Sequence, residues 1–199
     1  RLRRLGINHI TNCKDVANAF PSTHHRHLNN ASAKLCTPGD EIYFRQRHAY
    51  GCCSIKAADR SITILCNSGG LQGDHSAPRE FMTSYHGQIG PWRGHCLQLP
   101  GQKLMLVICP ISSIVCDIGF TSFVDDVCDK VVEDPLQQSF SPHERACQLV
   151  HQAEHTNRLF SAYIKESGHA QNTSKQEHLL FVPLAVLLWI LVARLARMH

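Results

Sequence analysis

The hydrophobic and polar positions along the chain predict a mixture of strands and helices. Strands are expected from short apolar or alternating runs. The first covers Leu2–Val16 and ends at the polar pair Lys14-Asp15. The others are expected at residues 62–66, at 104–109 and on both sides of Asp125-Asp126.

Two helices are predicted in the first half of the chain. One enters at Pro21-Ser22, repeats leucine and alanine at helical spacing, and is expected to stop at Pro38-Gly39. The other opens at 76–78 and carries an apolar stripe of Phe81, Tyr85 and Ile89, with Gly90-Pro91 as its expected end.

The clearest helix start is at Ser141. Ser141, Pro142 and Glu144 supply an N-cap residue, a first-turn proline and the carboxylate of a capping box. An apolar stripe continues to Gly168, which is typical of a helix end. Taken together, the elements predict an α+β fold in which two or more helices pack on one face of an antiparallel sheet.

The sequence divides into a main domain, residues 1–180, and an apolar tail, residues 181–199. The apolar run itself is Leu179–Ala193, followed by Arg194 and Arg197. Fifteen helical residues rise about 22 Å, which is short of a hydrocarbon core of about 30 Å. A membrane span, a displaced core helix and a segment translated outside the ancestral reading frame all remain open.

Composition restricts the function classes only slightly. A formal net charge of +4 favours anionic partners without the concentration of basic residues usual in nucleic-acid binders. The ten cysteines form no CxxC pair, so we expect reduced thiols in a nuclear or cytoplasmic protein. A zinc site at His24, His25, His27 and Cys36 is disfavoured because ligand pairs are missing on one side.

Three aspartates lie at expected strand ends or turns: Asp15, Asp125 and Asp126. Carboxylates there can reach a bound cation, and two magnesium ions held by such groups catalyse phosphoryl transfer. An Asp-Asp pair in a turn is, however, more often explained by turn chemistry alone.

The neighbouring residues change this balance, because four segments in order resemble the palm motifs of reverse transcriptases. They are Asp15–Phe20; Gly70–Asp74 with Pro78 beyond it; Phe123–Asp126; and Gly168–Lys175. The likeness extends from about residue 7 to 180 and is strongest to non-long-terminal-repeat (LINE-like) retrotransposon polymerases. It implies an RNA-directed DNA polymerase palm with two Mg²⁺ ions, an RNA template, a DNA primer and deoxynucleoside triphosphates as partners.

The resemblance also assigns roles to single residues. Asp15, Asp125 and Asp126 would be the catalytic, metal-binding carboxylates. Phe20 would be a steric gate against the ribose 2′-hydroxyl, Gln72 and Gly73 would contact the nucleotide and template, and Lys175 would approach the triphosphate. The competing interpretation of Phe20 is an ordinary core phenylalanine.

Two departures from the family pattern limit the expected activity. The arginines that precede the first motif are Arg1, Arg3 and Arg4, so we expect the fingers to be incomplete here and their triphosphate clamp to lie upstream of Arg1. An apolar tail stands where the family continues into a basic thumb. The alternative is therefore a catalytically inactive reverse transcriptase remnant, and a membrane tether through residues 179–193 is one form that it can take.

Overall fold

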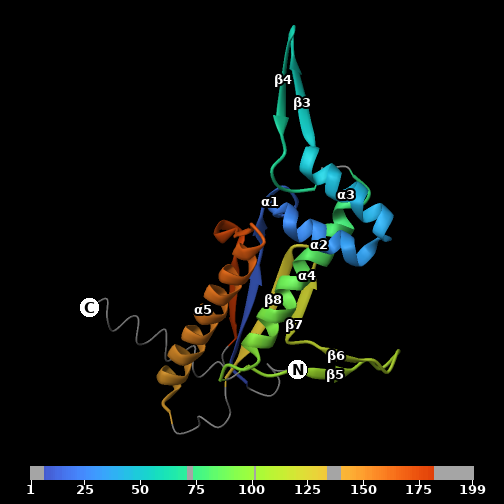
Figure 1. The fold of residues 1–199 in the computed structure, drawn as a ribbon. Helices are drawn as coiled ribbons and strands as arrows, with labels where there is room; N and C mark the ends of the chain where they lie inside the picture. Colours follow the sequence, from blue (N-terminus) through green and yellow to red (C-terminus); the bar gives the residue numbers. More distant parts are fainter. Residues whose placement is uncertain (1–6, 71–73, 101, 134–139, 182–199) are drawn as a thin grey trace, which may run out of the picture. The chain divides into compact units, whose positions relative to one another are not determined.

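The computed structural model describes residues 7–70, 74–100, 102–133 and 140–181 of the chain (Figure 1). Runs of helices and runs of strands follow one another along the chain in an α+β arrangement. The strands are β1 His9–Lys14, β2 Val16–Ala17, β3 Cys52–Ala57, β4 Arg60–Leu65, β5 Leu106–Ile108, β6 Val115–Asp117, β7 Phe120–Phe123, β8 Asp126–Val132, β9 Ala170–Gln171 and β10 Glu177–Phe181. The helices are α1 Ala19–Ser22, α2 His25–Leu35, α3 Pro38–Tyr50, α4 Ala77–Cys96, α5 Pro142–Glu166 and the 3₁₀ turn Thr173–Lys175.

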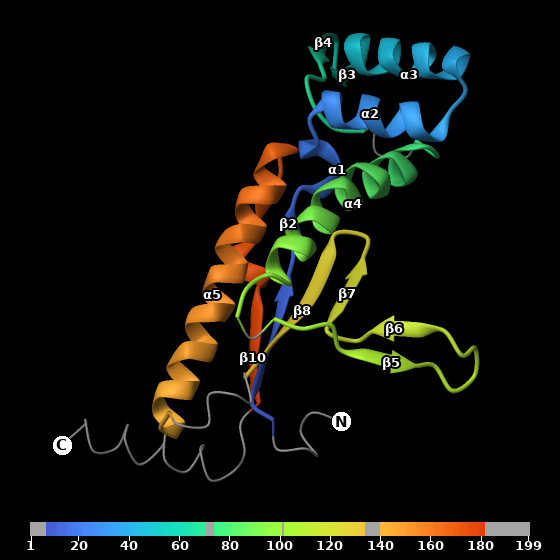
Figure 2. The same ribbon diagram turned by 60° about the horizontal axis from the view of Figure 1, so that its bottom comes forward.

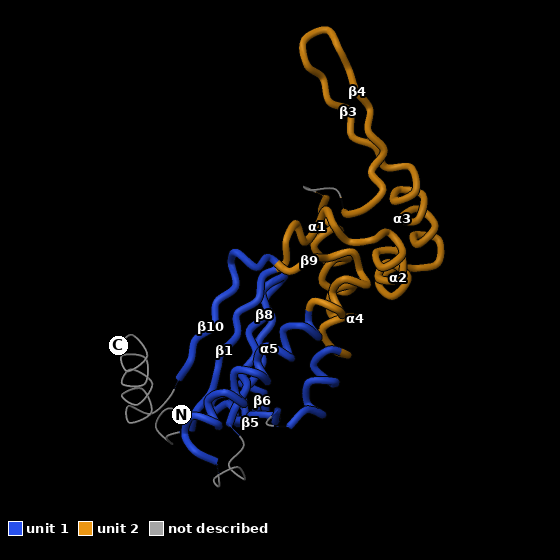
Figure 3. Tube along the Cα trace, turned by 90° about the vertical axis from the view of Figure 1, so that its left-hand side faces the viewer, with its two compact units in different colours: residues 1–15, 92–160, 172–199 blue, residues 16–91, 161–171 orange. Residues whose placement is uncertain are grey.

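The chain divides into two compact units (Figure 3). Unit 1 consists of residues 1–15, 92–160 and 172–199, and unit 2 of residues 16–91 and 161–171. Helices α4 and α5 each contribute residues to both units.

Unit 1 contains a four-stranded antiparallel sheet in the order β10-β1-β8-β7. The first strand of the chain is therefore a central strand, and α5 runs along the sheet in both ribbon views (Figures 1 and 2). Ile10 and Val131 are paired on β1 and β8 and form a buried cluster with Leu149 and Ala153 of α5. Since paired residues share a face, this cluster identifies the face of the sheet that the helices cover.

Unit 2 has a helical core and an extended hairpin. In the core, the ring of Phe81 lies 4.7 Å from that of Phe20 and 5.3 Å from that of Tyr85. The hairpin β3–β4 is exposed along its whole length (Figure 1). The strand predicted at residues 62–66 corresponds to β4, whereas its partner β3 was not predicted.

The capping box of α5 is confirmed. Glu144 accepts a hydrogen bond from the Ser141 amide at 2.8 Å, and the Ser141 hydroxyl accepts one from the Glu144 amide at 3.3 Å. The helix ends at Glu166, and Gly168 follows with a φ of 92°, a left-handed conformation that favours glycine.

One predicted helix end was wrong, and one helix start was not predicted. The helix expected to stop at Pro38-Gly39 does end before it, since α2 ends at Leu35. Pro38 also begins α3, because Thr37 is an N-cap that accepts from the Asp40 amide and Pro38 takes the first-turn position. Gly90-Pro91 does not end α4, which continues to Cys96. Trp92 and Cys96 are fully buried beyond Pro91, so packing outweighs the loss of one backbone hydrogen bond.

The apolar run at 179–193 begins in a strand. Its first three residues complete β10, where Leu179, Leu180 and Phe181 pair with β1, and the remainder lies outside the described residues. Among the residues that the structure describes, no helix is long and apolar enough to cross a membrane.

Candidate active site

Two of the predicted carboxylates meet at one end of the central strands. The β1–β8 ladder ends with Lys14 paired to Val127, so the next residues, Asp15 and Asp126, adjoin across the same strand pair. Figure 2 shows β1 and β8 side by side. The register, fixed over six residue pairs, therefore brings together two aspartates that lie more than a hundred positions apart in sequence.

Asp15 is held by residues of the fourth motif. The Asn172 side chain donates to Asp15 Oδ2 at 2.8 Å, and the Asn172 amide donates to the Asp15 carbonyl at 2.9 Å. Lys175 Nζ lies 3.5 Å from the same carboxylate oxygen, although the lysine side chain is 70% exposed. The sequence assigned Asn172 no role, and its position in the motif was the only signal that could have suggested one.

Asp125 occupies the two-residue turn between β7 and β8. Val124, the first turn residue, has a φ of 55°, which strains a β-branched side chain. The β3–β4 hairpin repeats this arrangement, with Ala58 at a φ of 53° followed by Asp59. Turn chemistry alone thus accounts for an aspartate at the second position, but not for the adjacent Asp126 on β8.

Electrostatic interactions link the three carboxylates. Partial burial, followed by the negative charges of Asp125 and Asp15, raises the pKa of Asp126 above its ordinary value. A hydrogen bond with the Asp15 carboxyl raises it further, while Lys175 opposes the shift. Repulsion among like charges is the usual consequence of carboxylates that share one small site.

A buried polar layer that the sequence did not predict lies on the covered face, next to these carboxylates. Lys14 and Asp129 form an ion pair in which both side chains are almost fully buried. Asn12 donates to Asp129 at 3.4 Å, and Lys14 Nζ lies 5.1 Å from the ring centroid of Trp92. Burial lowers the pKa of Lys14 to about 7, while the adjacent carboxylate favours the charged form.

The remaining predicted site residues belong to the other unit or lie outside the description. Phe20 is in α1 of unit 2, half-buried against Phe81. Its role as a sugar gate stays a prediction. Gln72 and Gly73 lie outside the described residues.

Several solved structures are similar to this chain, and one of them is a telomerase. The apo telomerase of Candida tropicalis, truncated from its C-terminal domain, superposes with a TM-score of 0.56 at 10% sequence identity. The fold is distantly polymerase-like. The match covers 87% of this chain and 31% of that telomerase chain, so this chain spans less than a third of its length. No protein-family model and no curated protein matches the sequence.

The residues at the carboxylate end of this polymerase-like fold fit a divalent cation in donor type. Carboxylate oxygens are the ligands that Mg²⁺ prefers. Among the residues that the structure describes, there is no group of three or more His, Cys, Asp or Glu side chains that could hold a metal ion. What the structure does contain is the Asp15–Asp126 contact, with Asp125 near enough to act electrostatically.

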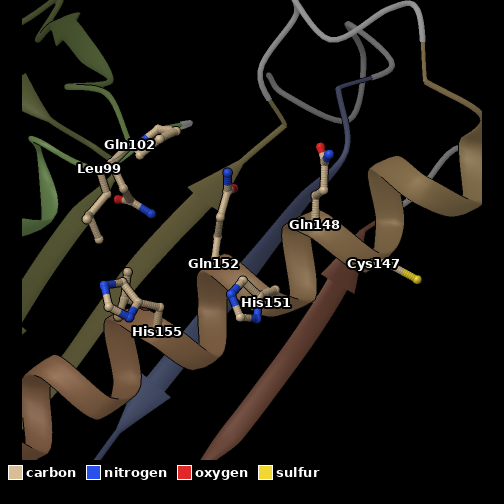
Figure 4. A pocket seen from close by; sticks show the side chains of 9 residues that line it. Leu99, Gln102, Cys147, Gln148, His151, Gln152 and His155 are labelled. Atoms are coloured by element: carbon tan, nitrogen blue, oxygen red, sulfur yellow. The ribbon is translucent and has the colours of Figure 1, made fainter.

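A separate cavity of about 590 Å³ lies beside the N-terminal half of α5 (Figure 4). Leu99 and Gln102 face Gln152 and His155 of α5 across it. It contains none of the predicted site residues. The side-chain amide group of Gln102 is buried there, and neither its oxygen nor its nitrogen has a hydrogen-bond partner among the described residues.

Proposed function

We propose that this chain is the palm portion of an RNA-directed DNA polymerase, derived from a LINE-like retrotransposon. The proposal depends chiefly on the adjacency of Asp15 and Asp126. Asp125 lies beside them, in the turn that joins β7 to β8. Four motifs in reverse transcriptase order and the distant likeness to a telomerase support it.

In this proposal Asp15, Asp125 and Asp126 hold two Mg²⁺ ions. When bound, the ions would lower the pKa of the primer 3′-hydroxyl and stabilise the leaving pyrophosphate. Asn172 keeps the Asp15 carboxylate oriented through its 2.8 Å hydrogen bond. The partners would be an RNA template, a DNA primer and deoxynucleoside triphosphates.

Lys175 is proposed to exchange partners during nucleotide binding. Its side chain is exposed and its 3.5 Å contact with Asp15 is a weak surface pair. A cation on Asp15 would repel the ammonium group, which could then approach a triphosphate. Phe20, Gln72 and Gly73 would contact the sugar, base and template, as the motif resemblance implies.

The test compares two matched aspartates by Mn²⁺ binding, measured by calorimetry or electron paramagnetic resonance. Asp125→Ala and Asp59→Ala remove aspartates at the same position of two similar hairpin turns. We expect Asp125→Ala and Asp126→Ala to weaken Mn²⁺ binding at least tenfold, while Asp59→Ala leaves it unchanged.

Primer extension on an RNA template with Mg²⁺ is the second measurement. Synthesis that Asp125→Ala abolishes and Asp59→Ala preserves would establish the polymerase. Equal Mn²⁺ affinity in all variants, with equal background extension, would instead establish the alternative: a remnant that keeps the motifs without catalysis.

A further inference from the structure

Two cysteine thiols face each other across the central strands of unit 1. Cys13 of β1 and Cys128 of β8 are direct partners in the ladder. The Cys128 thiol donates a hydrogen bond to the Cys13 sulfur, with 3.0 Å between the two sulfur atoms. Both cysteines are free and half-buried, so small reagents can reach them.

The backbone already has the geometry that a disulfide needs. Directly opposed residues of antiparallel strands have Cα atoms roughly 4.5 or 5.5 Å apart, and disulfides span roughly 4.4–6.8 Å. A sulfur–sulfur bond is about 2.05 Å long, so the two sulfurs need to approach by about 1 Å. Because six consecutive pairs fix the register, the strands cannot slide to separate the thiols.

A second pair of sulfurs provides an internal comparison. Cys53 and Cys66 lie 3.6 Å apart on the exposed β3–β4 hairpin of unit 2. They are not ladder partners, because Cys53 pairs with Ile64 and Cys66 follows the end of β4. The longer sulfur separation and the absence of direct pairing make this the less favourable site for a bond.

We propose that Cys13 and Cys128 are an oxidisable dithiol that closes to a cross-strand disulfide in the presence of a disulfide oxidant such as oxidised glutathione. The thiolate of one cysteine attacks the glutathione disulfide and releases one glutathione thiolate. The second cysteine then attacks the mixed disulfide and releases the other. Two protein thiols are oxidised, one glutathione disulfide is reduced to two thiols, and the two cysteine protons end on glutathione.

The site of this modification adjoins the carboxylates. Cys13 is two residues before Asp15, and Cys128 is two residues after Asp126. A disulfide here would link β1 and β8 directly beside the carboxylates and restrict their relative movement, and a metal-binding geometry tolerates only small changes in the groups around it. This regulatory consequence rests on the proposed function, whereas bond formation does not.

Bond formation is tested by incubating the whole protein with oxidised glutathione and mapping its peptides without reduction. Trypsin combined with a protease that cleaves before aspartate separates Cys128 from Cys109 and Cys116. We expect a linked peptide that contains Cys13 and Cys128, absent from Cys13→Ser and Cys128→Ser. In each single variant the remaining thiol should carry glutathione instead.

The matched control is the double variant Cys53→Ser, Cys66→Ser, which should form the Cys13–Cys128 link at the same rate as the unmodified protein. A reduced Cys13 in wild-type protein, under conditions that link Cys53 to Cys66, would overturn the proposal. Thermal unfolding of Cys13→Ser, Cys128→Ser checks that the folded state survives loss of both thiols.

Mn²⁺ binding separates this proposal from the proposed function. Oxidation should weaken Mn²⁺ affinity roughly tenfold, in line with other disturbances just outside a metal site, and a reductant should restore it. The double serine variant should be insensitive to oxidant. Absence of Mn²⁺ binding in the reduced protein would count against the metal site alone, while unchanged affinity after complete linkage would refute the regulatory effect.

Discussion

At the scale of single residues, the most costly feature is the ion pair beneath the candidate site. Lys14 and Asp129 are 0% and 1% exposed, respectively. Taking both charges out of water costs several kcal/mol per ion, which the pair recovers only if both partners are present. The pair also lies on β1 and β8; Asp15 directly follows β1, and Asp126 is the first residue of β8.

Removing one partner should therefore destabilise the fold strongly. We expect Lys14→Met to lower the free energy of unfolding by about 3–5 kcal/mol, because it leaves the Asp129 charge buried and unpaired. Adding Asp129→Asn removes that charge and keeps an oxygen that can accept from Asn12. Urea unfolding of the single and double variants is the measurement. Failure of the double variant to recover at least half of the loss would contradict this account.

A second residue-scale prediction concerns acid stability. Burial lowers the pKa of His169 to about 4, and its ring lies 2.9 Å from the Thr23 hydroxyl and 2.8 Å from that of Ser167. The unfolded chain protonates this histidine near pH 6.5, but the folded protein does so only near pH 4. The stabilisation is therefore complete above pH 6.5 and is lost as the pH falls to 4.

The protonation of His169 lowers the free energy of unfolding by about 3 kcal/mol as the pH falls from 6.5 to 4. Urea midpoints at pH 7.5 and 4.5 should show a smaller loss of stability for His169→Gln than for wild type, since glutamine keeps polar contacts and does not titrate. Identical losses in both proteins would mean that His169 does not contribute.

Residue types and order selected the three carboxylates of the candidate site, whose role stays a prediction, but they did not indicate the buried residues beneath them. Asp15, Asp125 and Asp126 were selected because a motif resemblance joined them. Lys14 was not, because a lysine beside an aspartate at a strand end is ordinarily solvated. Nothing local in the sequence indicates that it is buried. Its burial follows from Trp92 and Phe160, whose rings lie 5.1 and 5.7 Å from the ammonium group.

At the scale of elements, the β7–β8 hairpin stores strain. A valine at a φ of 55° is unfavourable, and such strain costs on the order of 1–3 kcal/mol. The β-branched side chain therefore remains there only because the ladder on either side determines the turn.

Val124→Gly should relieve that strain. We expect a gain of about 1 kcal/mol in unfolding free energy, after allowance for the greater flexibility of glycine in the unfolded chain. Ser122→Gly, on the adjoining strand and without a positive φ, is the comparison and should lower stability. Chemical denaturation monitors both, and a loss of stability in Val124→Gly would show that the valine side chain contributes packing that outweighs its strain.

The elements predicted from local signals were mostly correct in type, and their errors concentrate at proline. The capping box of α5 was recognised because all its groups are local. The start of α3 at Pro38 was not predicted, although Thr37 caps it, and α4 passes Pro91 because buried side chains follow it. The short strands β9 and β10 were missed because their partners are more than 150 residues away.

At the scale of the whole molecule, the net charge limits how tightly the chain can bind a nucleic-acid duplex. Its formal net charge is +4, and the chain spans 31% of the telomerase chain that it resembles. Affinity for a nucleic-acid duplex derives largely from lysine and arginine contacts with phosphates, each of which adds to the salt dependence.

We therefore expect weak, strongly salt-sensitive binding to an RNA–DNA primer–template and little primer extension by this chain alone. Fluorescence anisotropy from low to physiological salt should show the affinity falling steeply, with a log–log slope proportional to the number of phosphate contacts. Tight binding that is insensitive to salt would contradict the expectation and imply recognition by other means.

The position of β1 in the centre of the sheet has a consequence for biosynthesis. β1 precedes both of its partners in the chain, so one of its edges stays unpaired until β8 is made and the other until β10 is made. At ordinary translation rates roughly ten to thirty seconds separate the synthesis of Lys14 from that of Glu177. Throughout that interval the nascent strand presents at least one unpaired edge, which other chains can recruit. Its long-range pairings also predict slow folding, so the yield of folded protein should depend on chaperones that shield β1 until β10 has emerged from the ribosome.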